Sequence, residues 1–357
     1  MLPKTMEDYI QETSSVLSEN INHRKELLRP MFHWLEQEGI REGKQLVIVA
    51  SGSSYNAVYS ALPFMRKYMK NEIHLMTPFS FSYYEEFKEN YIYIFVSQSG
   101  CSTNVVEAIQ KYQKTGRKAL AVLGNGNSAI GKMADQYIEY GAGEEKVGYV
   151  TKGMSTLCCF FMLAALELEA EAMDPDIYNS VVEELKTAAK NHKEMYEEAK
   201  IFCSEHKKPL LSMKKVFLIS CGANLGTVME GALKLSEMVH IQTTSYEIEE
   251  FIHGPDLQLT PEYTLFFVSG RDQAGKRIEE IYSAAGEITE KAFLIQLEEE
   301  QYKISEIVSP LYLTAFFQYL ACWTARELNI TTEHPLYGAF EKKIHCKTDD
   351  YEEESPF

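Results

Sequence analysis

The sequence predicts an α/β chain built from two similar halves, each with a mainly parallel sheet between helices. Short apolar, β-branched runs such as Gln45–Ala50 and Val216–Ser220 are typical of strands buried on both faces of a parallel sheet. Each of these runs is followed by a Gly-containing turn and then by apolar residues at helical spacing. The 357 residues are enough for two domains with sizeable cores.

The first half begins and ends with helical patterns around four predicted strands. The predicted strands are Gln45–Ala50, Tyr91–Val96, Ala119–Leu123 and Gln136–Tyr140, and the predicted helices are Met6–Glu38, Tyr55–Met69, one that ends near Thr115, and Leu157–Ala170. Leu157–Ala170 is apolar, but it is shorter than the ~20 residues that span a membrane. We therefore interpret it as a buried helix.

The second half repeats this plan after a charged helical segment, Asp174–His206. Its predicted strands are Val216–Ser220, Thr264–Val268 and Ala292–Gln296, and its predicted helices are Thr227–His240, Ala274–Gly286 and Leu311–Leu328. The last helix has no charge until Arg326, which favours a place in the core or at a dimer seam. The repeated order of strand, turn and helix indicates an internal duplication.

Two loops of the first half have the composition of anion-binding loops. Ser51–Ser54 and Ser97–Thr103 each lie between a predicted strand and a predicted helix, where backbone N–H groups face an anion. A Ser-rich helix cap is the alternative, but a cap needs one Ser and the second loop offers four hydroxyls. Neutral hydrogen bonds and the helix dipole are suited to a phosphate group.

The predicted helix Thr227–His240 carries three charged residues on one face. Glu230, Lys234 and Glu237 are spaced i, i+4, i+7, and His253 follows in a Gly-Pro turn. Most helical Glu–Lys pairs are only surface ion pairs, which is the simpler interpretation. A carboxylate and an imidazole from different elements also form a plausible proton-transfer pair.

These motifs resemble those of a known family. The run Glu230–Glu237 and the later His253-Gly254-Pro255 resemble the isomerase part of glucosamine-6-phosphate synthase, where LEGALKLKE precedes HGP with the same gap of sixteen residues. In the first half, SGSSY and SQSGCS resemble the family's SGTSY-like and SQSGET motifs. The chain is therefore identified as a member of the sugar isomerase (SIS) superfamily, and its length resembles that of the fructosamine-6-phosphate deglycases.

The resemblance implies two SIS-type, doubly wound, three-layer αβα domains in tandem, with mainly parallel five-stranded sheets. The expected divisions are an N-terminal helical segment (1–25), a SIS domain with the phosphate loop (26–175), a connecting helix (176–210), a SIS domain with the catalytic Glu and His (211–340) and a C-terminal tail (341–357).

The resemblance also implies roles for individual residues. Glu237 would be the base at C1/C2 of an open-chain sugar phosphate, His253 would open the ring, Lys234 would stabilise developing oxygen charge, and Glu230 would hold Lys234. The residues expected to bind substrate or phosphate are Ser53, Ser54, Ser97, Gln98, Ser99, Ser102, Thr103, Glu145 and the tail residue Lys343, for which Lys342 is an alternative. Cys101 departs from the family, which often has Glu there.

Composition limits the classes of partner. A net charge of −17 argues against nucleic acid, which requires a basic face. Seven scattered Cys without metal-like spacing, and no secretion signal, favour a reduced, cytoplasmic protein. We expect no metal, no cofactor and no membrane contact, and a homodimer with shared active sites or a higher homo-oligomer.

The resemblance and the lack of a glutaminase domain favour a deglycase that splits a phosphorylated sugar–amine adduct into a hexose 6-phosphate and a free amine. Two alternatives stay open: an amino-sugar phosphate isomerase or deaminase of the same superfamily, and a non-catalytic regulator that binds sugar phosphates. The sequence does not distinguish a fructosamine from a 2-amino-glucose type of adduct, and it does not identify the amine.

Overall fold

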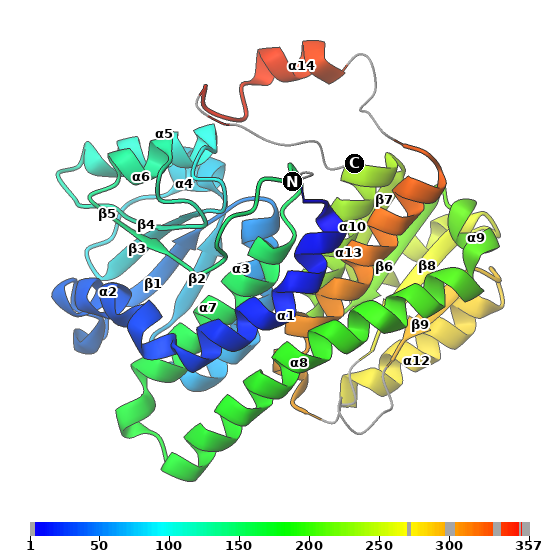
Figure 1. Ribbon diagram of the computed structural model, residues 1–357, viewed down its shortest axis with the longest axis horizontal. Coiled ribbons are helices and arrows are strands. Elements are labelled where there is room, and N and C mark those ends of the chain that lie inside the picture. Colours follow the sequence, from blue (N-terminus) through cyan, green and yellow to red (C-terminus); the bar gives the residue numbers. More distant parts are fainter. Residues whose placement is uncertain (1–3, 270–272, 297–303, 331–336, 350, 352–357) are drawn as a thin grey trace.

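The computed structural model describes residues 4–269, 273–296, 304–330, 337–349 and 351 and confirms the tandem α/β architecture (Figure 1). The first half has a five-stranded parallel sheet in the order β2-β1-β3-β4-β5. Over the described residues the second half has a four-stranded parallel sheet in the order β7-β6-β8-β9, one strand fewer than expected. The strands are β1 (Gln45–Val49), β2 (Ile73–Met76), β3 (Tyr91–Ser97), β4 (Leu120–Leu123), β5 (Gln136–Glu139), β6 (Lys215–Ser220), β7 (Gln242–Glu247), β8 (Tyr263–Val268) and β9 (Ala292–Ile295).

Successive apolar side chains of the first sheet point to opposite faces, so both faces are apolar and both are covered by helices. Leu46 and Ile48 of β1 face one layer, whereas Val47 and Val49 face the other. The first layer contains α1 (Met6–Asn22), α2 (Arg24–Gln37), α3 (Ser53–Tyr68) and α7 (Lys152–Leu168), and the second contains α4 (Pro78–Tyr84), α5 (Thr103–Gln113) and α6 (Ala129–Met133). The single helix predicted over Met6–Glu38 is wrong in detail, since His23 leaves helical geometry between α1 and α2.

One apolar core joins the two halves. It contains side chains from the inner faces of both sheets and from α7, α8 (Pro175–Glu205), α10 (Asn224–Val239) and α13 (Pro310–Glu327). Every residue of α7 except Glu167 is buried, so the prediction of a buried helix is confirmed. Nearly all of α13 is buried as well, which makes it part of the core. The outer face of the second sheet is covered by α11 (Ile248–Phe251) and α12 (Gln273–Gly286), while the short α9 (Lys207–Leu211) follows α8.

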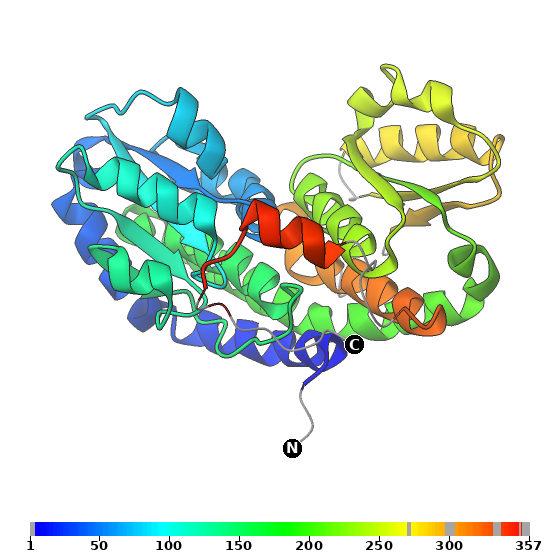
Figure 2. The same ribbon diagram turned by 90° about the horizontal axis from the view of Figure 1, so that it is seen from above.

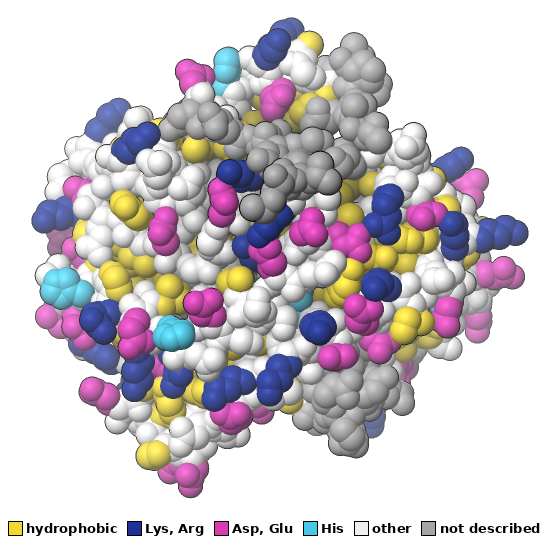
Figure 3. Space-filling model, viewed as in Figure 1, with side chains coloured by type: hydrophobic (Ala, Val, Ile, Leu, Met, Phe, Trp, Pro, Cys, Tyr) yellow, Lys and Arg dark blue, Asp and Glu magenta, His cyan; other side chains and the backbone are white. Residues whose placement is uncertain are grey.

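A short C-terminal helix, α14 (Tyr337–Ile344), lies apart from both sheets. It is at the top of the molecule in Figure 1 and crosses its middle in Figure 2. Residues 352–357, predicted to be an acidic tail, lie outside the described residues. Acidic and basic side chains are mixed over the face shown in Figure 3. Within the described ranges, no helix has the length and hydropathy needed to cross a bilayer.

Candidate active site

The charged helix α10 begins after β6 and a turn in which Gly222 has a φ of 55°. The helix places Glu230, Lys234 and Glu237 on one face, as their spacing predicts. Lys234 Nζ donates to Glu237 Oε2 at 2.7 Å and lies 3.3 Å from Glu230 Oε1. The side chains of Lys234 and Glu230 are 1% exposed, whereas that of Glu237 is 30% exposed. These three residues therefore form a buried charged row that opens to solvent at Glu237, not a surface ion pair.

Helix α3 of the first half holds the inner end of this row. Ser53 Oγ donates to Glu230 Oε1 at 2.8 Å, and Asn56 Nδ2 donates to Glu230 Oε2 at 2.9 Å. Lys234 Nζ in turn donates to Ser53 Oγ at 3.2 Å. The hydroxyl of Ser53, expected to hold phosphate, is thus used between Glu230 and Lys234. Asn56 was not predicted, because its contact joins residues 174 positions apart.

Close packing of α10 on α3 depends on Gly226. A Cβ at this position would lie 2.2 Å from Ser60 Oγ and 2.7 Å from Ser60 N, so any larger residue would push the two helices apart. Gly226 therefore lets the charged row of one half reach the polar start of α3 in the other.

Burial and charge have opposing effects on the row. Burial disfavours the charged form of Lys234, but the carboxylates of Glu230 and Glu237 outweigh this effect and raise its pKa. Burial raises the pKa of Glu237 by more than the neighbouring Lys234 lowers it. Lys234 therefore stays an ammonium, and Glu237 is a carboxylate with more than ordinary affinity for a proton, which suits a general base.

The loop Ser97–Thr103 between β3 and α5 forms the opposite side of the site. Ser97 is 2% exposed and supports the loop, because its Oγ accepts from Gly100 N at 3.1 Å and lies 3.2 Å from Ser102 Oγ. Gly100 has a φ of 69°, and a Cβ there would lie 2.0 Å from Ser128 Oγ. The loop is therefore built around a glycine and presents its remaining polar side chains outward.

A cavity of about 550 Å³ lies between this loop and Glu237. Of the predicted residues, Ser53, Ser54, Gln98, Ser99, Ser102, Thr103 and Glu237 line it. The backbone around Gly148–Val150 and the C-terminal segment complete its walls. The cavity thus brings the predicted base and most of the predicted phosphate-binding residues together.

The C-terminal segment is attached to this loop by its backbone. Thr103 Oγ1 donates to His345 O at 2.7 Å, Thr103 N donates to Cys346 O at 3.2 Å, and Thr348 N donates to Cys101 O at 2.9 Å. Lys347 pairs with Ser102 in an isolated antiparallel bridge.

This attachment brings Lys347 Nζ to within 3.0 Å of Ser99 Oγ in the cavity wall. Lys343, the predicted tail lysine, and its alternative Lys342 are exposed on α14 and do not line the cavity. The tail lysine that the structure brings to the site is therefore Lys347, which was not predicted from the sequence.

His253 and Glu145, which were also predicted to belong to the site, do not line this cavity. His253 is exposed, and its Nδ1 is 2.7 Å from Glu249 O in the same short segment. Glu145 accepts hydrogen bonds from Thr151 N and, at 2.7 Å, from Gly153 N at the start of α7. It lines a neighbouring cavity. Among the described residues no three His, Cys, Asp or Glu side chains are grouped in a way that would hold a metal ion.

Comparison with known proteins agrees with this architecture. Residues 39–168 match the family model of the SIS domain. A glutamine–fructose-6-phosphate aminotransferase (isomerizing) from Caldanaerobacter subterraneus subsp. tengcongensis is 26% identical over 267 residues, which cover 73% of this chain and 41% of that protein. The homologous enzyme of Cyanidium caldarium is 30% identical over 229 residues, covering 59% of this chain and 36% of the enzyme. The chain thus matches less than half the length of these two relatives.

Solved structures show the same fold over nearly the whole chain. A candidate phosphosugar isomerase from Clostridium difficile 630 superposes with a TM-score of 0.82 at 25% identity, covering 97% of this chain and 99% of that one. The C-terminal domain of glucosamine-fructose-6-phosphate aminotransferase from Francisella tularensis gives a TM-score of 0.73 at 20% identity, covering 92% and 98%. Residues 39–168 therefore match the SIS domain, and the tandem fold is shared with these two solved structures, as the motifs predicted.

Proposed function

We propose that this protein is an enzyme that acts on phosphorylated sugar–amine adducts and releases a hexose 6-phosphate and an amine. The observation that carries the proposal is that Glu237, which is paired with the buried Lys234, lines one cavity with a hydroxyl-rich loop. A carboxylate with a raised pKa beside a fixed ammonium fits proton transfer next to a carbonyl, because the base takes the carbon proton while the cation stabilises the enolate oxygen.

The phosphate group would lie on the loop of Gln98, Ser99 and Ser102, with Lys347 as its cation. This lysine supplies a positive charge that the loop itself lacks, and it already lies 3.0 Å from Ser99 Oγ. In this role Lys347 replaces Lys343 in the set of substrate-binding residues.

The adduct, and not the sugar phosphate alone, is favoured by a second cavity of about 1310 Å³ that adjoins the first. Gln98 and Ser99 line both cavities, so a substrate bound at this loop has room for an amine beyond the sugar. The test is a panel of phosphorylated adducts with different amines, assayed for hexose 6-phosphate and free amine. Equal turnover of unphosphorylated adducts, or no turnover of any adduct, would contradict the proposal.

An amino-sugar phosphate isomerase or deaminase is the second candidate, favoured by similarity to the aminotransferases named above. Such an enzyme would convert glucosamine 6-phosphate or fructose 6-phosphate itself, and it would not need a substrate that carries a further amine on the sugar. A regulator that only binds sugar phosphates would leave the Lys234–Glu237 pair without a use.

The ring-opening role of His253 requires a second copy of the chain, because the residue is exposed and does not line the cavity that holds Glu237. A homodimer in which each site receives His253 from the partner would complete the site. Mixing Glu237→Gln with His253→Ala under subunit exchange should then restore about a quarter of wild-type activity, since half of the dimers are mixed and each has one intact site. No recovery after verified exchange would place both residues in one chain's site.

A further inference from the structure

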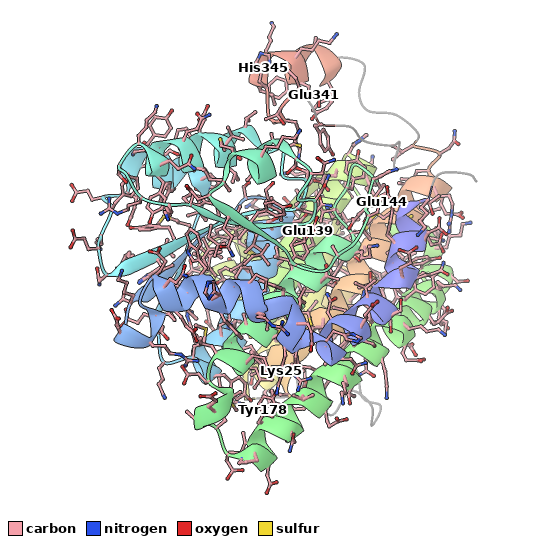
Figure 4. All side chains as sticks on the ribbon, turned by 60° about the vertical axis from the view of Figure 1, so that its left-hand side comes forward. Lys25, Glu139, Glu144, Tyr178, Glu341 and His345 are labelled. Carbon is pink, nitrogen blue, oxygen red and sulfur yellow. The ribbon has the colours of Figure 1, made fainter. Side chains whose placement is uncertain are left out.

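The second cavity shares three lining residues with the first: Gln98 and Ser99 of the loop, and Tyr351. Its other walls come from α1, from the loops after β4 and β5, and from the start of α7. Figure 4 shows two of its lining residues, Glu139 and Glu144, below Glu341 and His345 of the C-terminal segment. A substrate that fills both cavities would have its sugar in one and its amine in the other.

Three side chains, of which Gln98 and Glu145 line the second cavity, converge at Gly153. A Cβ at Gly153 would lie 2.9 Å from Tyr140 Oη, 2.9 Å from Gln98 Cγ and 3.1 Å from Glu145 Oε2. Any side chain at this position would displace them. The glycine therefore lets the phosphate loop, a tyrosine hydroxyl and a carboxylate approach one point.

The hydroxyl of Tyr140 is left without a partner. The residue is fully buried, and within the described part of the chain its Oη makes no hydrogen bond. Buried hydroxyls are rarely left in this state, because an unmade hydrogen bond costs stability. Tyr140 lines neither cavity, and its unpaired hydroxyl lies beside Glu145, which lines the second one. The tyrosine is therefore placed to act through Glu145.

Burial and the neighbouring groups shift the pKa of Glu145 in opposite directions. Burial raises its pKa to about 7, although the amides of Thr151 and Gly153 and the ammonium groups of Lys152 and Lys234 act to lower it. Tyr9 and Tyr140 are also titratable groups near it, and burial and Glu145 both raise the pKa of the Tyr140 phenol. Near neutral pH both forms of Glu145 are therefore populated, so this group can accept a proton and return it.

We propose that Glu145, with the Tyr140 hydroxyl beside it, transfers protons to the nitrogen of the leaving amine, and that the second cavity holds this amine. The inference rests on the proposed function, in which Glu237 first converts the adduct into an imine.

Hydrolysis of that imine then needs two proton transfers. The Glu145 carboxylate takes a proton from water as the water oxygen bonds to the imine carbon, and it passes this proton to nitrogen. The new hydroxyl then loses its proton through the same carboxyl to nitrogen. The C–N bond breaks with its electron pair left on nitrogen, and the hexose phosphate carbonyl forms.

The test separates the two half-reactions in Glu145→Gln and Tyr140→Phe. Exchange of the substrate's carbon-bound proton with D₂O reports the step at Glu237, and amine release reports the step at Glu145. We expect Glu145→Gln to keep the exchange rate and to lower amine release by ~10²-fold or more, with loss of the pH dependence near 7. Tyr140→Phe removes an unpaired hydroxyl, so we expect it to fold normally and to slow only amine release. The control is Glu183→Gln, an exposed carboxylate on α8.

Unchanged amine release in Glu145→Gln would overturn the inference, and so would an equal loss of both half-reactions. If the wild-type protein neither exchanges the proton nor releases an amine from any adduct, the proposed function itself fails.

Discussion

In the first half of the molecule, the helix after the first strand, α3, begins with neutral side chains. In the second half, the corresponding helix, α10, carries Glu230, Lys234 and Glu237. Both helices follow the first strand of their half, β1 or β6, which lies second in sheets ordered β2-β1-β3-β4-β5 and β7-β6-β8-β9. A duplicated scaffold thus presents two different surfaces to one site. In the proposed function, the hydroxyls of the first half bind the phosphate, and the charged row of the second half transfers the proton from carbon.

The contact between these two helices explains how buried charge is tolerated. Glu230 accepts hydrogen bonds from Ser53 and Asn56 of the first half, so its carboxylate is satisfied at both oxygens. A buried ion pair is stable only when such additional hydrogen bonds compensate for lost hydration. Neither half would hold the row by itself.

The largest effect is expected from removing the cation of the second half. Lys234→Ala leaves Glu230 buried next to Glu237 without its ammonium, and we expect the free energy of unfolding to fall by about 3–5 kcal/mol in urea denaturation. The matched control is Lys186→Ala, which removes an exposed ion pair with Glu183 and should cost at most about 1 kcal/mol. Equal effects in the two variants would show that the row is not a buried network.

The second largest effect is expected on KM, from a change in the loop Ser97–Thr103 of the first half. Ser99→Ala removes a hydroxyl from the cavity wall, and a lost hydrogen bond to a charged group is worth about 1.5–3 kcal/mol. We expect KM for a phosphorylated adduct to rise about tenfold or more, with kcat little changed. Ser15→Ala, on the exposed side of α1, is the control and should change neither constant. A fall in kcat with no change in KM would mean that Ser99 acts in the chemical step, which would contradict the binding role proposed for the first half.

The packing between the halves is tested by Gly226→Ala. The added Cβ would overlap Ser60 Oγ and Ser60 N, and overpacking of this kind typically costs about 1–3 kcal/mol. We expect a lower melting temperature by calorimetry. Gly286→Ala, where a Cβ meets nothing within 4 Å, serves as the control. An unaltered melting temperature in Gly226→Ala would mean that α10 does not lie against α3 this closely.

The last effect appears only with acid and concerns the core that joins the halves. Both ring nitrogens of His192 on α8 are buried without a partner in the described part of the chain, and burial lowers its pKa to about 3. The unfolded chain binds a proton at pH about 6.5, so between this pH and 3 the unfolded state holds more protons than the folded state. Stability should therefore fall as the pH is lowered from 6.5. His192→Leu should flatten this part of the profile, and an identical slope would reject the assignment.

Much of this fold could be predicted from sequence because the central strands are continuous apolar runs. The two strands that were missed, β2 and β7, are each one of the two edge strands of their sheet. β7 has the sequence QTTSYE and is only partly buried, so it lacks the apolar signal of its neighbours.

The site could be predicted in part for a similar reason. Spacing along one helix placed Glu230, Lys234 and Glu237 on one face, since that geometry is local. The contacts of Asn56 and Lys347 depend on chain segments 174 and 248 positions away, for which the local pattern carries no signal.

The division of work between the halves is tested most directly by Glu237→Gln. The amide is nearly isosteric but cannot take a proton from carbon, so turnover should fall by ~10² or more while the phosphate loop still binds substrate. Titration calorimetry with a phosphorylated adduct, together with the rate of amine release, measures both quantities on the same sample. We predict a dissociation constant within about threefold of wild type, because this change corresponds to less than about 0.7 kcal/mol, and almost no turnover. Turnover at the wild-type rate, or loss of binding without loss of kcat, would contradict the account.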